Sequence, residues 1–149
     1  MALAFRNLTT SPDDPVADWP TEAVETALER GDLADWRRIV AELKRAPWGR
    51  TAHQVEEVLS HSRPYGIADA MTVVLDRIRA DTEHRDREEV AAEVNSMITR
   101  SGLSRAEFAA HIGTSASRLS TYATGTVTPS ATLLLRMRRV AEQQGHHRR

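Results

Sequence analysis

The stretch of sequence that decides the fold, residues 104–125, reads SRAEFAAHIGTSASRLSTYATG. It holds two short apolar patterns with helical spacing, separated by Gly113. Ser104 and Glu107 form the S-x-x-E pattern of a capping box, in which each side chain satisfies a backbone amide at a helix start. Gly113 stands where a left-handed residue would end that helix and turn the chain. The pattern therefore predicts one short helix that begins after Ser104 and ends at Gly113.

A second short helix is predicted directly after this turn. Ser115 can cap its start, and Gly125 can end it. Helices of about two turns are marginal in isolation, so both must pack on neighbouring helices, which we expect over residues 88–100 and 129–143. Two short helices joined by a tight glycine turn have the geometry of a helix–turn–helix motif, whose second helix can enter a DNA major groove.

Residues 102–141 resemble the helix–turn–helix domains of the Cro/repressor (XRE) family. The resemblance needs no gap and includes the small Ala109, the turn residue Gly113, the apolar Leu119 and the glycine after the second short helix. With the preceding helix it extends over residues 88–143. It implies a lambda-repressor-like helical fold and sequence-dependent binding of double-stranded DNA by a transcriptional regulator, which we expect to be a repressor.

The resemblance also implies which residues contact DNA. Arg105 holds a position that usually contacts a backbone phosphate, and the start of the second helix usually faces base edges. Arg118 can reach a phosphate or a base, and neighbouring hydroxyl groups can donate to phosphate. The expected DNA-binding residues are Arg105, Thr114, Ser115, Ala116, Ser117, Arg118, Thr121 and Thr124.

This segment departs from the family in its base-reading residues. Asn, Gln and additional basic residues, which read adenine and guanine, are scarce on the second helix. The methyl groups of Ala116 and Thr121 can instead contact thymine. The loop after Gly125 is often basic in the family but reads TVT here. Five further arginines either contact phosphate or lie on a solvated helix face. They are Arg136, Arg138, Arg139, Arg148 and Arg149.

The whole chain is expected to be all-α, with an N-terminal helical bundle before the helix–turn–helix domain. Ala and Arg are abundant and β-branched runs are rare, which favours helix over strand. Helix starts are predicted after Pro20, at Asp32 and at Thr51, the last with Gln54 in a capping box. The charged segment RADTEHRDREE indicates either an exposed helical linker or a break near residues 81–82. The expected segments are an irregular region at 1–18, a helical domain at 19–80, a linker at 81–87, the helix–turn–helix domain at 88–144 and a disordered basic tail at 145–149.

Charge is distributed unevenly along the chain. The net charge is −1, but residues 1–99 carry 12 basic and 19 acidic side chains, whereas residues 100–149 carry 8 and 2. A basic C-terminal part favours a polyanionic partner such as DNA. The sequence contains no Cys, no signal-peptide pattern and no apolar stretch long enough to span a membrane. We therefore expect a cytoplasmic protein without disulfides.

No pattern in the sequence indicates catalysis, a metal or a cofactor. His53, Glu57 and His61 have helical spacing, but the H-E-x-x-H pattern is absent, and a surface helix explains these residues better. Neither a glycine-rich phosphate loop nor a nucleophile elbow occurs. We expect no enzyme activity. Trp48, beside Pro47, is a candidate for contact with a partner.

The expected partners are double-stranded DNA and a second copy of the chain. One such domain contacts little DNA, so we expect a homodimer on paired half-sites, with the N-terminal domain as the source of the dimer interface. A second hypothesis is an antitoxin-like module, whose acidic N-terminal domain covers a protein partner while the helix–turn–helix domain regulates its own operon. A third is a ligand-responsive regulator with a pocket between the N-terminal helices.

Overall fold

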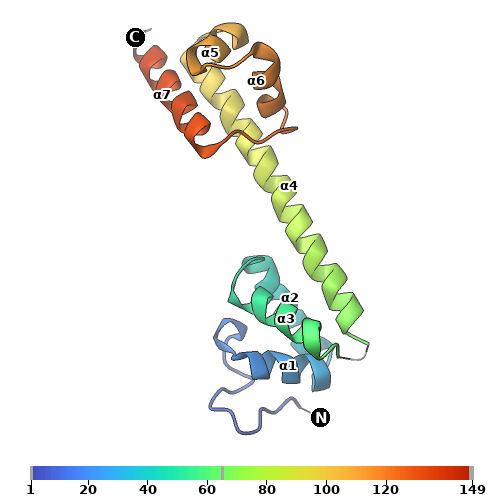
Figure 1. Ribbon diagram of the computed structural model, residues 1–149. Coiled ribbons are helices and arrows are strands. Elements are labelled where there is room, and N and C mark those ends of the chain that lie inside the picture. Colours follow the sequence, from blue (N-terminus) through green and yellow to red (C-terminus); the bar gives the residue numbers. More distant parts are fainter. Residues whose placement is uncertain (1, 65, 148–149) are drawn as a thin grey trace. The chain divides into compact units, whose positions relative to one another are not determined.

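The computed structural model describes residues 2–64 and 66–147, and the regular elements in these ranges are all helical. This confirms the all-α fold class (Figure 1). The chain divides into two compact units, residues 1–82 (unit 1) and residues 83–149 (unit 2). The elements are η1 (Val16–Asp18), α1 (Thr21–Arg30), α2 (Leu33–Arg45), α3 (Arg50–His61), α4 (Ala68–Ser101), α5 (Arg105–Ile112), α6 (Ala116–Ala123) and α7 (Ala131–His147).

Unit 1 is built around a fully buried Trp19. The indole Nε1 donates a hydrogen bond to the carbonyl of Asp14, 3.0 Å away, and the ring of Phe5 meets the indole edge-on with centroids 5.1 Å apart. The guanidinium of Arg38 lies over the indole ring and donates to the carbonyl of Pro12. The irregular segment at the N-terminus is therefore packed against the core by aromatic and cation–π contacts.

In unit 1 the helix start predicted at Asp32 is confirmed, whereas the one predicted at Thr51 is not. Asp32 caps α2, and hydrogen bonds from the amides of Asp35 and Ala34 lower the pKa of the Asp32 carboxyl. The prediction of a capping box at Thr51 and Gln54 was wrong, because α3 begins at Arg50 and both side chains are buried within it. Gln54 Nε2 instead donates to the carbonyl of Trp19 at 2.9 Å.

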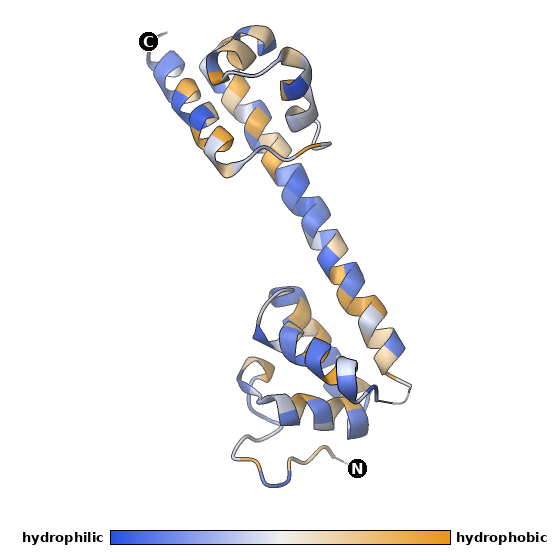
Figure 2. Ribbon diagram, viewed as in Figure 1, coloured by the Kyte–Doolittle hydropathy of each residue, from blue (hydrophilic) through white to orange (hydrophobic). Residues whose placement is uncertain are grey.

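Helix α4 runs without a break from Ala68 to Ser101, so residues 81–87 are helical. Figure 2 shows hydrophobic residues in both end portions of α4 and hydrophilic residues between them. The first portion contributes Met71, Leu75 and Ile78 to the core of unit 1, and the last contributes residues of the 94–98 region to the core of unit 2. The absence of Gly and Pro between residues 67 and 101 explains why the charged middle stays helical.

The short helices of unit 2 persist because they are packed on both sides. Phe108, Ile112 and Leu119 are buried, together with Met97 of α4 and Met137 of α7. Helix α5 contacts both α6 and α7. Burial of large apolar side chains of this kind contributes about 1.5–3 kcal/mol each, which exceeds what two-turn helices gain from their own hydrogen bonds.

The turn between α5 and α6 has the geometry that the sequence predicts. Ser104 Oγ accepts a hydrogen bond from the amide of Glu107 at 3.1 Å, which caps the start of α5. The predicted capping box is only half formed, because the Glu107 carboxylate accepts from the Ser104 hydroxyl at 3.1 Å instead of from the Ser104 amide. Gly113 has φ +79°, and the amide of Thr114 donates to the carbonyl of Ala109 at 2.9 Å. This is the hydrogen bond of a Schellman motif, which requires a left-handed residue at the helix end.

Helix α7 extends to His147, so residues 145–147 are helical where a disordered tail was expected. Gly145 permits the close approach of α7 to α4, because an added Cβ would lie 3.3 Å from the carbonyl oxygen of Arg100. Arg148 and Arg149, expected in the same tail, lie outside the described residues. No helix in the part of the chain described here has the length and apolar character of a membrane span.

Replacing Gly113 tests how strongly the turn depends on a left-handed residue. We expect Gly113→Ala to lower the free energy of unfolding of unit 2 by about 1 kcal/mol, because a Cβ disfavours this conformation. Gly113→Asn should cost less, since Asn tolerates positive φ better. Urea unfolding followed by far-UV circular dichroism measures the loss, and the fluorescence of the three Trp residues, all in unit 1, gives the reference. Equal stability of all three proteins would contradict the assignment.

Candidate nucleic-acid interface

The first turn of α6 is exposed to solvent, whereas the inner face of the helix is buried in the core of unit 2. Leu119 and Tyr122 hold the inner face of α6 in the core, while Ala116, Ser117 and Arg118 are exposed on its first turn. The hydroxyl of Ser115 accepts a hydrogen bond from the amide of Arg118 at 3.0 Å. The amides of the first turn that precede Arg118 have no partner within the helix, as at any helix start, and they favour a negatively charged group.

Most hydroxyl groups in the predicted DNA-binding set already have a partner within the protein. Ser115 caps α6, Thr121 Oγ1 donates to the carbonyl of Arg118 at 2.6 Å, and Thr124 Oγ1 lies 2.9 Å from the hydroxyl of Thr126. Thr114 is half-buried beside the turn. Ser117, by contrast, is exposed, and no hydrogen bond of its hydroxyl occurs within the described ranges. Ser117 is therefore the hydroxyl that is freest to meet DNA.

Arg105 is oriented by Asn95, a residue that the sequence analysis did not single out. The guanidinium of Arg105 donates to Asn95 Oδ1 at 3.1 Å. Asn95 Nδ2 in turn donates to the carbonyl of Ala123 at 2.8 Å and to that of Ala91 at 2.9 Å. One amide side chain thus links α4, α5 and the end of α6. In the sequence, Asn95 could have been recognised as a polar residue next to Val94 within a helical stripe that is otherwise apolar.

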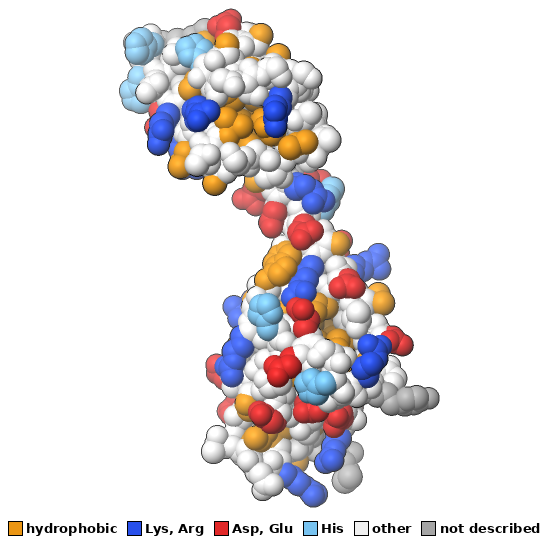
Figure 3. Space-filling model, viewed as in Figure 1, with side chains coloured by type: hydrophobic (Ala, Val, Ile, Leu, Met, Phe, Trp, Pro, Cys, Tyr) orange, Lys and Arg blue, Asp and Glu red, His pale blue; other side chains and the backbone are white. Residues whose placement is uncertain are grey.

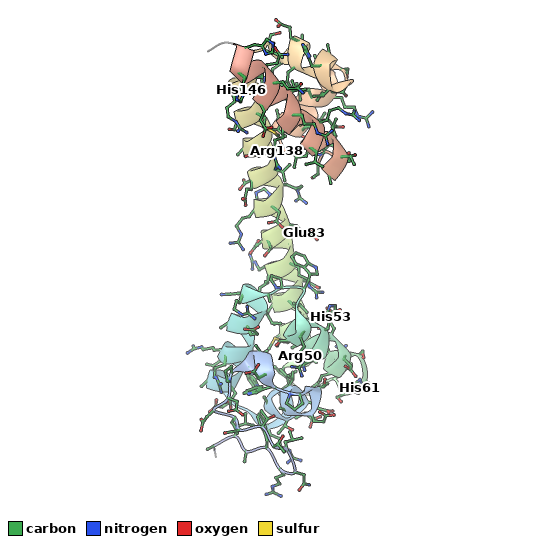
Figure 4. All side chains as sticks on the ribbon, turned by 90° about the vertical axis from the view of Figure 1, so that its left-hand side faces the viewer. Arg50, His53, His61, Glu83, Arg138 and His146 are labelled. Carbon is green, nitrogen blue, oxygen red and sulfur yellow. The ribbon has the colours of Figure 1, made fainter. Side chains whose placement is uncertain are left out.

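Several arginines of unit 2 are exposed, and they differ in whether a hydrogen bond within the protein holds the guanidinium. Arg136 donates to the carbonyl of Ile112 at 3.1 Å and so satisfies a carbonyl group at the end of α5. Arg118 Nε donates to the hydroxyl of Tyr122 at 3.2 Å, one turn along α6. Arg138 and Arg139 are exposed on α7, and Figure 4 labels Arg138 there. For Arg138 and Arg139, contact with phosphate and a place on a solvated helix face both stay predictions, whereas Arg136 has a structural role.

The face of unit 2 that Figure 3 shows carries blue basic side chains and few red acidic ones. The acidic residues of this unit lie mainly on α4, whose residues 83–93 contain five carboxylates. The loop after α6 packs on α4, because Gly125 has φ +79° and approaches Ala91 and the backbone of Arg87. A face of unit 2 with more basic than acidic side chains is the arrangement that attracts a polyanion.

The two histidines that the sequence analysis weighed as metal ligands belong to unit 1 and are distant in sequence from the helix–turn–helix segment. His53 and His61, labelled in Figure 4, are both exposed on α3. The described residues contain no group of three or more His, Cys, Asp or Glu side chains that could hold a metal ion.

Comparison with known proteins supports the helix–turn–helix assignment. Residues 77–149 match a family model described as a helix-turn-helix domain. Neither a comparison with curated proteins nor one with solved structures gave a match. The C-terminal part of the chain is therefore a helix–turn–helix domain, as predicted, while membership of the Cro/repressor family stays a prediction.

Replacing Asn95 tests its role as a link between three helices. We expect Asn95→Ala to lower the stability of unit 2 by about 1–2 kcal/mol, since the carbonyl of Ala123 and the guanidinium of Arg105 each lose a partner. Urea unfolding followed by circular dichroism measures the loss. Ser96→Ala, at the next and exposed position of α4, is the matched control and should change little. An unchanged Asn95→Ala protein would show that solvent satisfies these groups equally well.

Proposed function

We propose that the protein is a sequence-dependent transcriptional regulator of the Cro/repressor type that represses transcription by placing α6 in the major groove of double-stranded DNA. The observation that supports this most directly is the exposed first turn of α6 on a helix–turn–helix domain whose inner helix faces are buried. The small side chains of Ala116 and Ser117 let the backbone of α6 approach base edges closely. Arg118 extends from the same turn, where it can reach a phosphate or a base.

Arg105 contributes affinity for all sequences in this proposal. Its guanidinium is exposed and has donors left over after the hydrogen bond to Asn95. A guanidinium held by a neighbour loses less freedom when it binds a phosphate. Specificity then depends on α6, where the methyl groups of Ala116 and Thr121 favour thymine.

The proposed active form is a homodimer. A single helix–turn–helix unit reads one half-site, and two copies on paired half-sites supply the affinity and length of a natural operator. The antitoxin-like alternative shares the DNA-binding domain but assigns unit 1 to a protein partner. The antitoxin-like alternative becomes the preferred proposal if the purified chain binds no DNA at low salt.

Ser117→Glu separates loss of DNA binding from loss of folding. A carboxylate at the start of α6 should stabilise the helix through its dipole, yet it should repel phosphate and weaken DNA binding at least about tenfold. Fluorescence anisotropy with a labelled duplex from upstream of the protein's own gene, against scrambled DNA, measures binding. Ala34→Glu, which places the same charge in the first turn of α2, is the control. Unchanged binding by Ser117→Glu would exclude α6 from the interface.

Arg105→Ala tests the phosphate contact. Its affinity should fall to a similar extent for specific and scrambled DNA, and the slope of log K against log salt should decrease by about 1 between about 50 and 200 mM salt. Arg30→Ala, which removes an exposed arginine from unit 1, should leave the slope unchanged. A loss confined to the specific duplex would instead assign Arg105 to base recognition.

A further inference from the structure

Unit 1 contains an apolar groove between α2 and the first portion of α4, here called the α2–α4 groove. Its volume is about 350 Å³, and Trp36, Val40, Met71 and Val74 are among the residues that line it. Leu33, at the start of α2, also lines the groove and is 57% exposed. Large apolar side chains exposed along a groove indicate a surface that another molecule covers.

Two cations stand at the edge of this groove. Arg37 and Lys44 line it from α2 and are seven residues, or two helical turns, apart. No hydrogen bond or ion pair of either side chain occurs within the described part of the chain. The other two cations of α2 are occupied: Arg38 donates to carbonyl groups near the N-terminus, and Arg45 pairs with Glu42. The groove therefore presents two unpaired positive charges beside an apolar floor.

A surface of complementary character lies beside the groove on α4. Val73, which is 64% exposed, follows one turn after Ala70, a residue of the groove wall. Asp69 and Asp76 flank Val73 at a separation of seven residues, the same as that of the two cations. Asp69 holds Arg63 in an exposed ion pair, which is weak, and Asp76 is exposed without a partner in the described residues. We call Asp69, Val73 and Asp76 the α4 ridge.

We propose that the α2–α4 groove of one chain receives the α4 ridge of a second copy, with Val73 against the apolar wall and the carboxylates of Asp69 and Asp76 facing Arg37 and Lys44. One wall of the groove and the ridge both belong to α4, so a two-fold axis lets each copy both offer a ridge and receive one. The inference rests on the proposed homodimer and assigns its interface to unit 1. The equal spacing of the opposite charges favours a second copy over an unrelated helix or a small apolar acid.

The experiment exchanges charges between copies of the full chain. Variant A is Arg37→Glu with Lys44→Glu, and variant B is Asp69→Lys with Asp76→Lys. Each variant alone places like charges in both contacts, which should weaken self-association at least about a hundredfold. An equimolar mixture of A and B restores opposite charges in both contacts, so a dimer of A with B should form. Sedimentation velocity at tens of micromolar measures the oligomeric state, and circular dichroism checks that the helices are kept.

Arg6→Glu with Arg30→Glu is the control, because it makes the same change in net charge as variant A at exposed positions outside the groove. The expected results are dimers for the wild type, the control and the mixture, and monomers for A and for B. If variant A alone and variant B alone are still dimers, the dimer interface lies elsewhere than at the groove and the ridge. A monomeric mixture, or a monomeric wild type, would overturn the proposal that the α4 ridge of a second copy occupies the groove.

Binding of a single half-site by variant A separates this inference from the proposed function. Variant A keeps the whole helix–turn–helix domain, so its affinity for a duplex with one half-site should equal that of the wild type in anisotropy. If both proteins fail to bind any DNA while the charge exchange succeeds, the DNA-binding proposal fails and the dimer interface stands. If DNA binding is retained and the charge exchange fails, only the interface is wrong.

Discussion

Burial of Phe108, Ile112 and Leu119 between α4 and α7 is the interaction on which the helix–turn–helix domain depends. Neither α5 nor α6 is long enough to persist alone, so their positions are set by what they pack against. The left-handed Gly113 then directs the chain from one helix to the next within a single turn. As a result the first turn of α6 is exposed while the inner face of the helix is buried, and burial of this kind holds a recognition surface in place.

Helix α4 shows how one sequence element can serve two cores. The apolar residues of its first portion belong to the core of unit 1, and those of its last portion belong to the core of unit 2. The charged segment between the two portions has no apolar face. Pairs such as His84 with Glu88, 3.1 Å apart, lie one turn apart along this segment. Because such exposed pairs contribute only a few tenths of a kcal/mol, the helix is maintained chiefly by the cores at its two ends.

The polar side chains of unit 2 divide into those that maintain the fold and those that remain available. Asn95 and Arg136 satisfy carbonyl groups at the ends of α6 and α5, where a helix leaves them without internal partners. Ser117, Arg138 and Arg139 are exposed. In unit 1 the same division separates Arg38, which is occupied, from Arg37, which faces the α2–α4 groove. Arg37 therefore remains available to the second chain, and Arg138 and Arg139 to the polyanion, that are proposed to bind.

The sequence by itself determined the elements that depend on near neighbours. The all-α class, the cap at Ser104, the turn at Gly113 and the cap at Asp32 involve residues within one or two turns of each other, so local pattern was sufficient to predict them. Gln54 was misassigned because its partner is the carbonyl of Trp19, 35 positions away. Only the tertiary structure decided the link through Asn95 and the placement of an apolar groove beside an acidic ridge, since these depend on which helix faces are brought together by burial.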